Sequence, residues 1–258
     1  NNPKKRYKIM TEEMPKNGKL SLDMMYHTCG TQINLDYTSE EDFKRKFKVI
    51  SFLIPITIAL FSNSALKKGN ASGFLSYRSR VWQSTSRGGL PDVFLEDIDF
   101  EKYADFFLNF PLLFLFDNNE YKYSNGKTFN FLIENGMANK ENLELHLSTV
   151  FTELRLKKYI ELRSLDACEW DCHCAGPAFF AGLIYGGLEE TYEIIKNWKK
   201  DEIKNAYSVS CKKGLRTEIN GQDMFFWSKE LLKISKNGLN KRSFLNKKNN
   251  DETIYLKN

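Results

Sequence analysis

Alternation of polar and apolar residues dominates the stretch YIELRSLD, residues 159–166, and the residues just before it. Side chains two residues apart on a β-strand lie on the same face. Read as one strand, residues 153–163 place these polar or charged side chains on a single face: Glu153, Arg155, Lys157, Tyr159, Glu161 and Arg163. The other face is apolar except for Lys158. The pattern predicts a strand whose charged front is either a solvated sheet face or the floor of an ionic active site.

Two further stretches alternate with the same period of two. In residues 28–37, one face carries Thr28, Gln32, Asn34 and Asp36, and the other carries Ile33, Leu35 and Tyr37. In FLSYRSRVW, residues 74–82, one face of the predicted strand carries Ser76, Arg78, Arg80 and Trp82. All three predicted strands are apolar on one face only, whereas the strands of parallel doubly wound sheets are apolar on both. The pattern therefore favours an α+β fold with a mainly antiparallel, open-faced sheet.

Helical patterns separate these strands. A long helix is predicted over residues 38–62, beginning with Thr38 and Glu41 in capping-box register and bending at Pro55. A second helix is predicted in DFEKYADFFLNF, which ends before a proline.

Domain organisation is simple in this sequence. Residues 3–19 are basic and turn-rich, with MPKNGK marking a loop, and the section from Gly176 to about residue 238 is typical of amphipathic helix. No repeat and no composition break marks a linker. We therefore expect one domain over residues 1–240 with a mainly antiparallel sheet and a helical C-terminal section. Residues 241–258 are expected to form a flexible tail.

Composition and charge narrow the class of protein. The 258 residues are 41% hydrophobic, enough for a real core, and the net charge of +5 permits an anionic ligand without demanding nucleic acid. The odd number of cysteines indicates free thiols in a reducing compartment: Cys29, Cys168, Cys172, Cys174 and Cys211. The most apolar run, residues 49–61, is too short to span a bilayer. We expect a soluble, cytoplasmic protein with no nucleic-acid or membrane partner.

Short motifs exclude several kinds of site. The sequence has no P-loop and no dinucleotide-binding glycine motif. SRGGLP could wrap a phosphate with help from Arg87, or it could be an ordinary surface loop. CEWDCHCAG lacks the spacing of a structural zinc site, and the three histidines lie in unrelated contexts without a nucleophilic elbow.

The polar strand faces suggest one kind of chemistry. They carry Arg78 and Arg80, Glu161 and Arg163, and the short polar side chains Gln32, Asn34 and Asp36. Arginine holds carboxylate and phosphate oxygens in bidentate fashion, and a carboxylate beside it suits Mg²⁺. Arginine, carboxylate and metal together are the groups needed for phosphoryl transfer to a substrate carboxylate.

At these same residues the sequence resembles the proteobacterial and plant type of glutamate–cysteine ligase. The matching stretches, in the family's order, are TCGTQINLDYTSEEDFKRKFKVISFLIPITIALFSNS, GFLSYRSRVWQSTS, FEKYADFFLNFP, HLSTVFTELRLKKYIELRSLD and PAFFAGLIY. The resemblance implies a curved antiparallel sheet that forms a glutamine synthetase-like funnel and is flanked by helices. It also implies an enzyme that joins glutamate through its γ-carboxylate to cysteine, using ATP and Mg²⁺, in the first step of glutathione synthesis.

The resemblance also assigns roles to particular residues. Glu161 of IELR is expected to bind metal, with Glu153 as a second candidate, and Arg163 to hold the transferring phosphate. Arg78 of SYRS is expected to bind substrate. The remaining candidates for the substrate and nucleotide sites are Gln32, Asn34, Arg6, Trp82, Tyr103 and Arg87. Trp82 and Tyr103 could equally be core residues.

Three departures from the family keep alternatives open. The family's other acidic metal ligands precede Arg6 in a segment that this sequence does not contain. Asp171 and Cys172 replace basic residues of the family, and the regulatory cysteines of the plant enzymes have no match around YKYSNGKTFNF. The alternatives are a related ligase with a different amine acceptor, or an inactive fragment of a larger enzyme that binds nucleotide or nothing.

Overall fold

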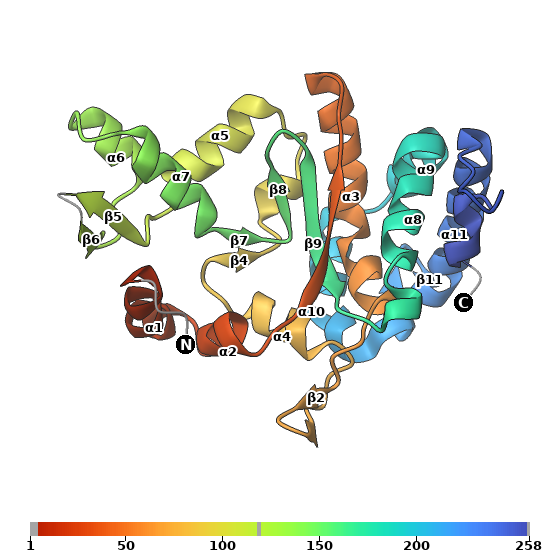
Figure 1. Ribbon diagram of the computed structural model, residues 1–258, viewed down its shortest axis with the longest axis horizontal. Helices are drawn as coiled ribbons and strands as arrows, with labels where there is room; N and C mark the ends of the chain where they lie inside the picture. Colours follow the sequence, from red (N-terminus) through yellow and green to blue (C-terminus); the bar gives the residue numbers. More distant parts are fainter. Residues whose placement is uncertain (1–4, 118–119, 257–258) are drawn as a thin grey trace.

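A three-stranded antiparallel sheet lies at the centre of the computed structural model, which describes residues 5–117 and 120–256 (Figure 1). Its strand order is β1 (Gly30–Leu35), β9 (Ile160–Asp166) and β8 (Leu154–Leu156). Along β1 every second residue is buried, so Ile33 and Leu35 face the core while Gln32 and Asn34 are exposed. The predicted one-sided strand over this stretch, and the α+β class, are confirmed.

The prediction of one continuous strand over residues 153–163 is wrong. The chain turns back after Leu156, and β8 and β9 form a hairpin in which the Lys157 N–H donates to the Tyr159 carbonyl oxygen at 2.8 Å. Residues opposite each other in a hairpin share a face. Arg155 therefore still lies on the same side as its partner Glu161, and the charged face survives the change of topology. The β9 part of that face is buried, because every residue of β9 is buried, whereas Gln32 and Asn34 of β1 are exposed.

The predicted strand over residues 74–82 is also wrong, because its second half is the helix α4 (Tyr77–Gln83). Ser76 caps this helix: its hydroxyl accepts a hydrogen bond from the Ser79 N–H at 3.1 Å. Four residues make about one helical turn. Arg78 and Trp82 consequently share a helix face, whereas Arg80 is exposed.

The long helix α3 (Glu40–Leu60) packs against β9 and contributes more buried residues to the central core than any other element. The helix includes Pro55, and its cap is Ser39, one residue later than the predicted Thr38. The Ser39 hydroxyl accepts from the Asp42 N–H at 3.2 Å, and Asp42 in turn accepts from the Thr38 N–H. The helix predicted after Asp99 is also confirmed and forms α5 (Phe100–Asn109).

The C-terminal section is helical, as predicted, and packs on the side of α3 away from α5 (Figure 1). It comprises α8 (Ala175–Ala181), the π-helical turn η3 (Gly182–Gly186), α9 (Leu188–Ile195), α10 (Lys200–Lys213) and α11 (Met224–Arg242). In the described part of the chain, no helix is long and apolar enough to cross a membrane.

The stretch expected to be turn-rich, with a loop at MPKNGK, is instead helical over residues 5–17. Its described residues form α1 (Lys5–Asn17), because Met10 and Met14 make an apolar stripe one turn apart that packs against Leu113 and Phe114. The other elements around this second core are α2 (Ser21–Tyr26), the hairpin of β5 (Phe114–Asp117) and β6 (Glu120–Tyr123), and α7 (Lys140–Ser148). The helix α6 (Phe129–Glu134) packs in a third apolar cluster with Leu112.

Shorter elements complete the fold. These are β2 (Leu66–Lys67), β3 (Asn70–Ala71), β4 (Gly88–Gly89), η1 (Asp92–Leu95), β7 (Phe151–Thr152), η2 (Trp170–Cys172), η4 (Gly214–Arg216), β10 (Glu218–Ile219), β11 (Gln222–Asp223) and η5 (Glu252–Leu256). The last of these falls within the expected tail, residues 241–258. There α11 continues to Arg242, Leu245 pairs with Asp251, and η5 packs against α8 and α11 with Thr253 buried.

Candidate active site

Two arginines and a tryptophan meet where α4 crosses the end of the sheet. The guanidinium carbon of Arg78 lies 4.6 Å from the centroid of the Trp82 ring, and that of Arg163 lies 4.7 Å from it. Arg78 also donates a hydrogen bond to the backbone oxygen of Arg163. Contacts between guanidinium groups and an aromatic face are attractive and strengthen when water is excluded. Here both arginines are buried, so the indole fixes the positions of two positive charges.

Two residues of the sheet, Gly30 of β1 and Asp166 of β9, help to determine where Arg78 lies. A Cβ atom on Gly30 would lie 2.5 Å from the Arg78 Nε, so glycine is needed for this close approach. Asp166, at the end of β9, accepts hydrogen bonds from the hydroxyls of Ser76 at 2.9 Å and Ser64 at 2.7 Å. These bonds tie the start of α4 to the sheet.

Two carboxylates accompany the arginines, each in a different setting. Glu153 is fully buried, and the Tyr207 hydroxyl donates to its Oε1 at 2.9 Å. Burial raises the pKa of Glu153, and the nearby positive charges of Arg78 and Arg163 partly oppose that rise.

Glu161 is surrounded by positive charge. Its Oε1 lies 2.8 Å from Lys157 Nζ, and its Oε2 lies 3.7 Å from Arg163 Nε and 3.8 Å from Arg155 Nη1. Burial lowers the pKa of Arg163 to about 9, and the neighbouring charge of Arg155 adds to this effect. The Arg163 guanidinium therefore remains charged at neutral pH while being poorly hydrated.

Several buried polar atoms in this cluster have no hydrogen-bond partner. They are Arg78 Nη1, Trp82 Nε1, Glu153 Oε2, Glu161 Oε2 and Arg163 Nε. Buried polar groups are normally paired, and leaving one unpaired costs about 1–3 kcal/mol. Three of these five atoms are N–H donors, which a bound carboxylate or phosphate could satisfy. The arrangement is therefore suited to binding and neutralising an anionic group.

The other candidates on the sheet lie as follows. Asn34 pairs across the sheet with Glu161, and Gln32 falls at an irregularity in the β1–β9 register; both are exposed on the polar face. Tyr103 of α5 belongs to the apolar core, and its hydroxyl accepts a hydrogen bond from the Leu156 N–H at 2.7 Å. These contacts stabilise β8. Packing in the core is one of the two roles that the sequence allowed for Tyr103.

Arg87 and Arg6 lie apart from this cluster. Arg87 donates to the backbone oxygens of Thr149 at 2.8 Å and Pro111 at 2.7 Å, and burial lowers its pKa to about 10. Arg6 is on α1, half-buried, with its guanidinium 5.4 Å from the Tyr7 ring centroid. Among the described residues, no hydrogen bond or ion pair links either arginine to Arg78, Arg163 or Glu161.

Sequence reasoning missed Tyr207. This residue lies on α10, which also buries Ile203, Ala206 and Cys211. The helical spacing of these apolar residues indicates an inward-facing side of α10, and a tyrosine beside them is a signal that could have been used. Its partner Glu153 is 54 residues away in the sequence, so the pairing itself could not be read.

The described residues do not fit a complete Mg²⁺ site. Among them, no group of three or more His, Cys, Asp or Glu side chains is placed to hold a metal ion. Mg²⁺ requires near-octahedral oxygen coordination. Glu161 offers one buried oxygen without a hydrogen-bond partner, and its other oxygen is paired with Lys157.

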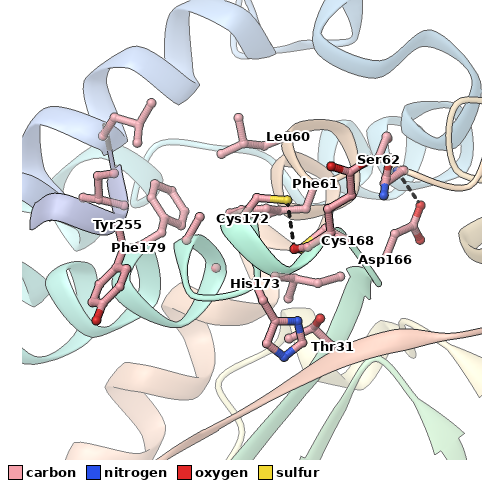
Figure 2. Close-up of a pocket in the computed structure, with 17 residues that line it drawn as sticks. Thr31, Leu60, Phe61, Ser62, Asp166, Cys168, Cys172, His173, Phe179 and Tyr255 are labelled. Atoms are coloured by element: carbon pink, nitrogen blue, oxygen red, sulfur yellow. Dashed lines mark hydrogen bonds between the residues drawn. The ribbon is translucent and has the colours of Figure 1, made fainter. Parts of the chain in front are cut away.

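A separate cavity of about 360 Å³ lies behind the apolar face of the sheet (Figure 2). Thr31 and Leu165 reach it from β1 and β9, and Phe61 and Phe179 reach it from the flanking helical segments. It is lined by Cys168 and Cys172 but by none of the arginines described above. The cavity is therefore distinct from the charged cluster.

The charged cluster lies at the end of a three-stranded antiparallel sheet and has buried N–H groups without partners, which suits an anionic group. Residues 1–258 match the family model of glutamate–cysteine ligase family 2, and the chain belongs to this family. It is similar to glutamate–cysteine ligase B, chloroplastic, of Oryza sativa subsp. japonica, with 38% identity over 254 residues, covering 94% of this chain and 51% of the rice protein. The chloroplastic glutamate–cysteine ligases of Medicago truncatula and Arabidopsis thaliana are each 38% identical over 257 residues, covering 94% of this chain and 50% and 49% of those proteins. The chain spans about half the length of these relatives.

The expectation of a cytoplasmic protein is contradicted by these relatives, whose names place them in chloroplasts. The expectation rested on free cysteines and on the lack of a long apolar run. Free thiols indicate a reducing compartment, but they do not say which one.

Proposed function

We propose that this protein catalyses the ATP-dependent ligation of glutamate, through its γ-carboxylate, to the amino group of cysteine, the first step of glutathione synthesis. The observation that carries the proposal is the buried cluster of Arg78, Trp82 and Arg163, whose unpaired N–H groups suit anionic oxygens. Family membership, and relatives named glutamate–cysteine ligase, support the same reaction.

The proposed reaction has two steps. A γ-carboxylate oxygen of glutamate attacks the terminal phosphorus of ATP, and ADP leaves with the electrons of the broken P–O bond. The cysteine amino nitrogen then attacks the acyl carbon of the γ-glutamyl phosphate, phosphate leaves, and the nitrogen loses a proton. Both steps place negative charge on oxygen atoms, which fixed cationic donors in a water-poor site stabilise strongly.

Each residue of the cluster has a distinct part in this proposal. Arg163 holds the transferring phosphoryl group and Arg78 holds a substrate carboxylate, because bidentate guanidinium groups match both. Trp82 keeps the two guanidinium planes in place. Gln32 and Asn34, exposed on the same face, offer amide groups to the substrates. Arg87 is not included, because three of its N–H groups are already bonded to Thr149 and Pro111.

Mg²⁺ remains part of the proposal only as a cofactor. When bound, it would neutralise phosphate oxygens of ATP, and Glu161 would supply one of its ligands, with Glu153 as the further candidate on this chain. No step above depends on it.

A coupled assay of ADP release tests the proposal on the purified protein. We expect turnover that requires glutamate, ATP and cysteine together and that yields γ-glutamylcysteine. Competition between cysteine and other small amines identifies the acceptor. Faster turnover with another amine would show a related ligase with a different acceptor, and no turnover with any amine would contradict ligase activity for this chain.

A further inference from the structure

Three cysteines near the end of β9 take no part in the proposed reaction. Cys168 and Cys172 are half-buried and line the cavity behind the sheet, whereas Cys174 is exposed and does not line it. All the cysteines are free thiols. Two nucleophilic side chains therefore line one cavity.

A tight turn brings the first two thiols together. The Cys172 N–H donates to the Glu169 carbonyl oxygen at 3.2 Å, and the His173 N–H donates to that of Trp170 at 3.2 Å. Cys168 and Cys172 lie on either side of this turn, and both line the same cavity (Figure 2). The Cys172 Sγ also donates to the Glu169 carbonyl oxygen at 3.3 Å, while the His173 ring is directed toward Thr31 (Figure 2).

We propose that Cys168 and Cys172 form a dithiol modification site that reacts with a low-molecular-weight disulfide and closes into an intramolecular disulfide. In the first step the Cys172 thiolate attacks one sulfur of the small disulfide, which forms a mixed disulfide and releases one thiolate. In the second step Cys168 loses its proton to water and attacks the Cys172 sulfur, which releases the second thiol. Two electrons pass from the protein to the reagent, whose two halves leave as thiols.

The surroundings of the two sulfurs support this order of attack. Burial raises the pKa of the Cys168 thiol to about 11, and its contact with Cys172 adds to the rise. Because the thiolate is the attacking form, Cys168 is poorly suited to the first step. Once Cys172 is in the mixed disulfide it carries no negative charge, and its contribution to the raised pKa of Cys168 disappears.

The volume and lining of the cavity determine which reagents can reach Cys168 and Cys172. Its volume of about 360 Å³ is within the range of small-molecule sites, and most of its wall is apolar, including Leu60, Phe61 and Phe179. A small uncharged disulfide fits this space, and 2-hydroxyethyl disulfide is the probe of choice.

Thiol counting by mass spectrometry tests the proposal. Reduced protein, freed of reductant, is treated with 2-hydroxyethyl disulfide and then alkylated under denaturing conditions. We expect a species that has lost two hydrogens, carries no adduct and leaves three of the five thiols for alkylation. A wild-type product that carries only stable mixed disulfides would overturn the proposal.

Serine variants identify the pair and the order of attack. Cys168→Ser should stop at a mixed disulfide on Cys172, and Cys172→Ser should slow the first reaction in this segment about tenfold or more. Cys174→Ser is the matched control, because it removes an exposed thiol of the same segment, and it should leave closure unchanged. Loss of closure in Cys174→Ser would show that the wrong pair was chosen. Thermal unfolding of each variant separates loss of reaction from loss of fold.

Discussion

Tyr207 donates the hydrogen bond that holds the fully buried Glu153. A buried carboxylate without a donor is costly, because the folded protein does not replace the water it has lost. The attraction of Arg78 and Arg163 offsets part of this cost, but their positions are fixed by Trp82 and by backbone contacts. The Tyr207 hydroxyl is thus an anchor for the charges of the candidate site.

Tyr207→Phe should therefore lower the free energy of unfolding by about 1–3 kcal/mol, since it leaves one more oxygen of Glu153 unpaired. Chemical denaturation monitored by circular dichroism measures the change. Tyr37→Phe is the matched control, because the Tyr37 hydroxyl donates to the Lys157 carbonyl oxygen at the surface, where water can replace it. Equal losses of unfolding free energy in the two variants would show that the hydrogen bond to Glu153 stabilises the fold no more than a surface hydrogen bond does.

At the scale of elements, the helix α4 carries two residues of the candidate site, Arg78 and Trp82. Its cap, Ser76, accepts from the Ser79 N–H and donates to Asp166 of β9 at 2.9 Å. One hydroxyl thereby starts the helix that carries Arg78 and Trp82 and fixes that helix to the sheet.

Ser76→Ala should cost about 1–2 kcal/mol of stability and also reduce ligase turnover, because the cap and the link to Asp166 are lost together. Thr128→Ala is the matched control, since Thr128 caps α6, at a distance from the site, and accepts from the Phe131 N–H. The control should lose stability without losing activity per folded molecule. If both variants keep full activity, the link between α4 and β9 does not position the site.

The elements that the sequence predicted correctly are those with strong local signals. β1 has a strict alternation over its length, and α3 has both a capping sequence and a long apolar pattern. The stretch around Arg78 is ambiguous, because side chains at positions 78, 80 and 82 share a strand face while 78 and 82 also share a helix face. The hydrogen bond from Ser76 to Asp166 joins residues 90 positions apart, and no local pattern shows it.

At the scale of the whole molecule, His146 links two helices, α7 and α5. Its Nε2 donates to the Phe107 carbonyl oxygen at 2.7 Å, which links α7 to α5, and its Nδ1 is buried without a partner. Burial lowers the pKa of His146 below its usual value of about 6.5. The folded state therefore keeps the ring neutral at a pH where the unfolded chain already binds a proton.

The sign of the pH effect follows from this difference. The stabilising contribution of neutral His146 is present above pH 6.5, and it is lost as the pH falls from about 6.5 toward the lower pKa of the folded state. Between pH 7.5 and 5.5, His146→Gln should lose less stability than the wild type, by at most about 1.4 kcal/mol per pH unit. His173→Gln is the control, because it removes an exposed imidazole and should keep the wild-type slope. Identical slopes in all three proteins would contradict the assignment.

The central claim is that the buried arginine cluster on the polar sheet face binds the substrates of a ligase. Steady-state kinetics with varied glutamate, comparing Arg78→Lys with Arg80→Lys, test it most directly. Both residues lie on α4 and both variants keep the positive charge, but Arg78 is buried against Trp82 and Arg80 is exposed. Arg78→Lys should lower kcat/KM for glutamate about tenfold or more, equivalent to about 1.4 kcal/mol, because a point charge replaces a bidentate group. Arg80→Lys should stay within about twofold of the wild type. An Arg78→Lys enzyme as active as Arg80→Lys would contradict the claim.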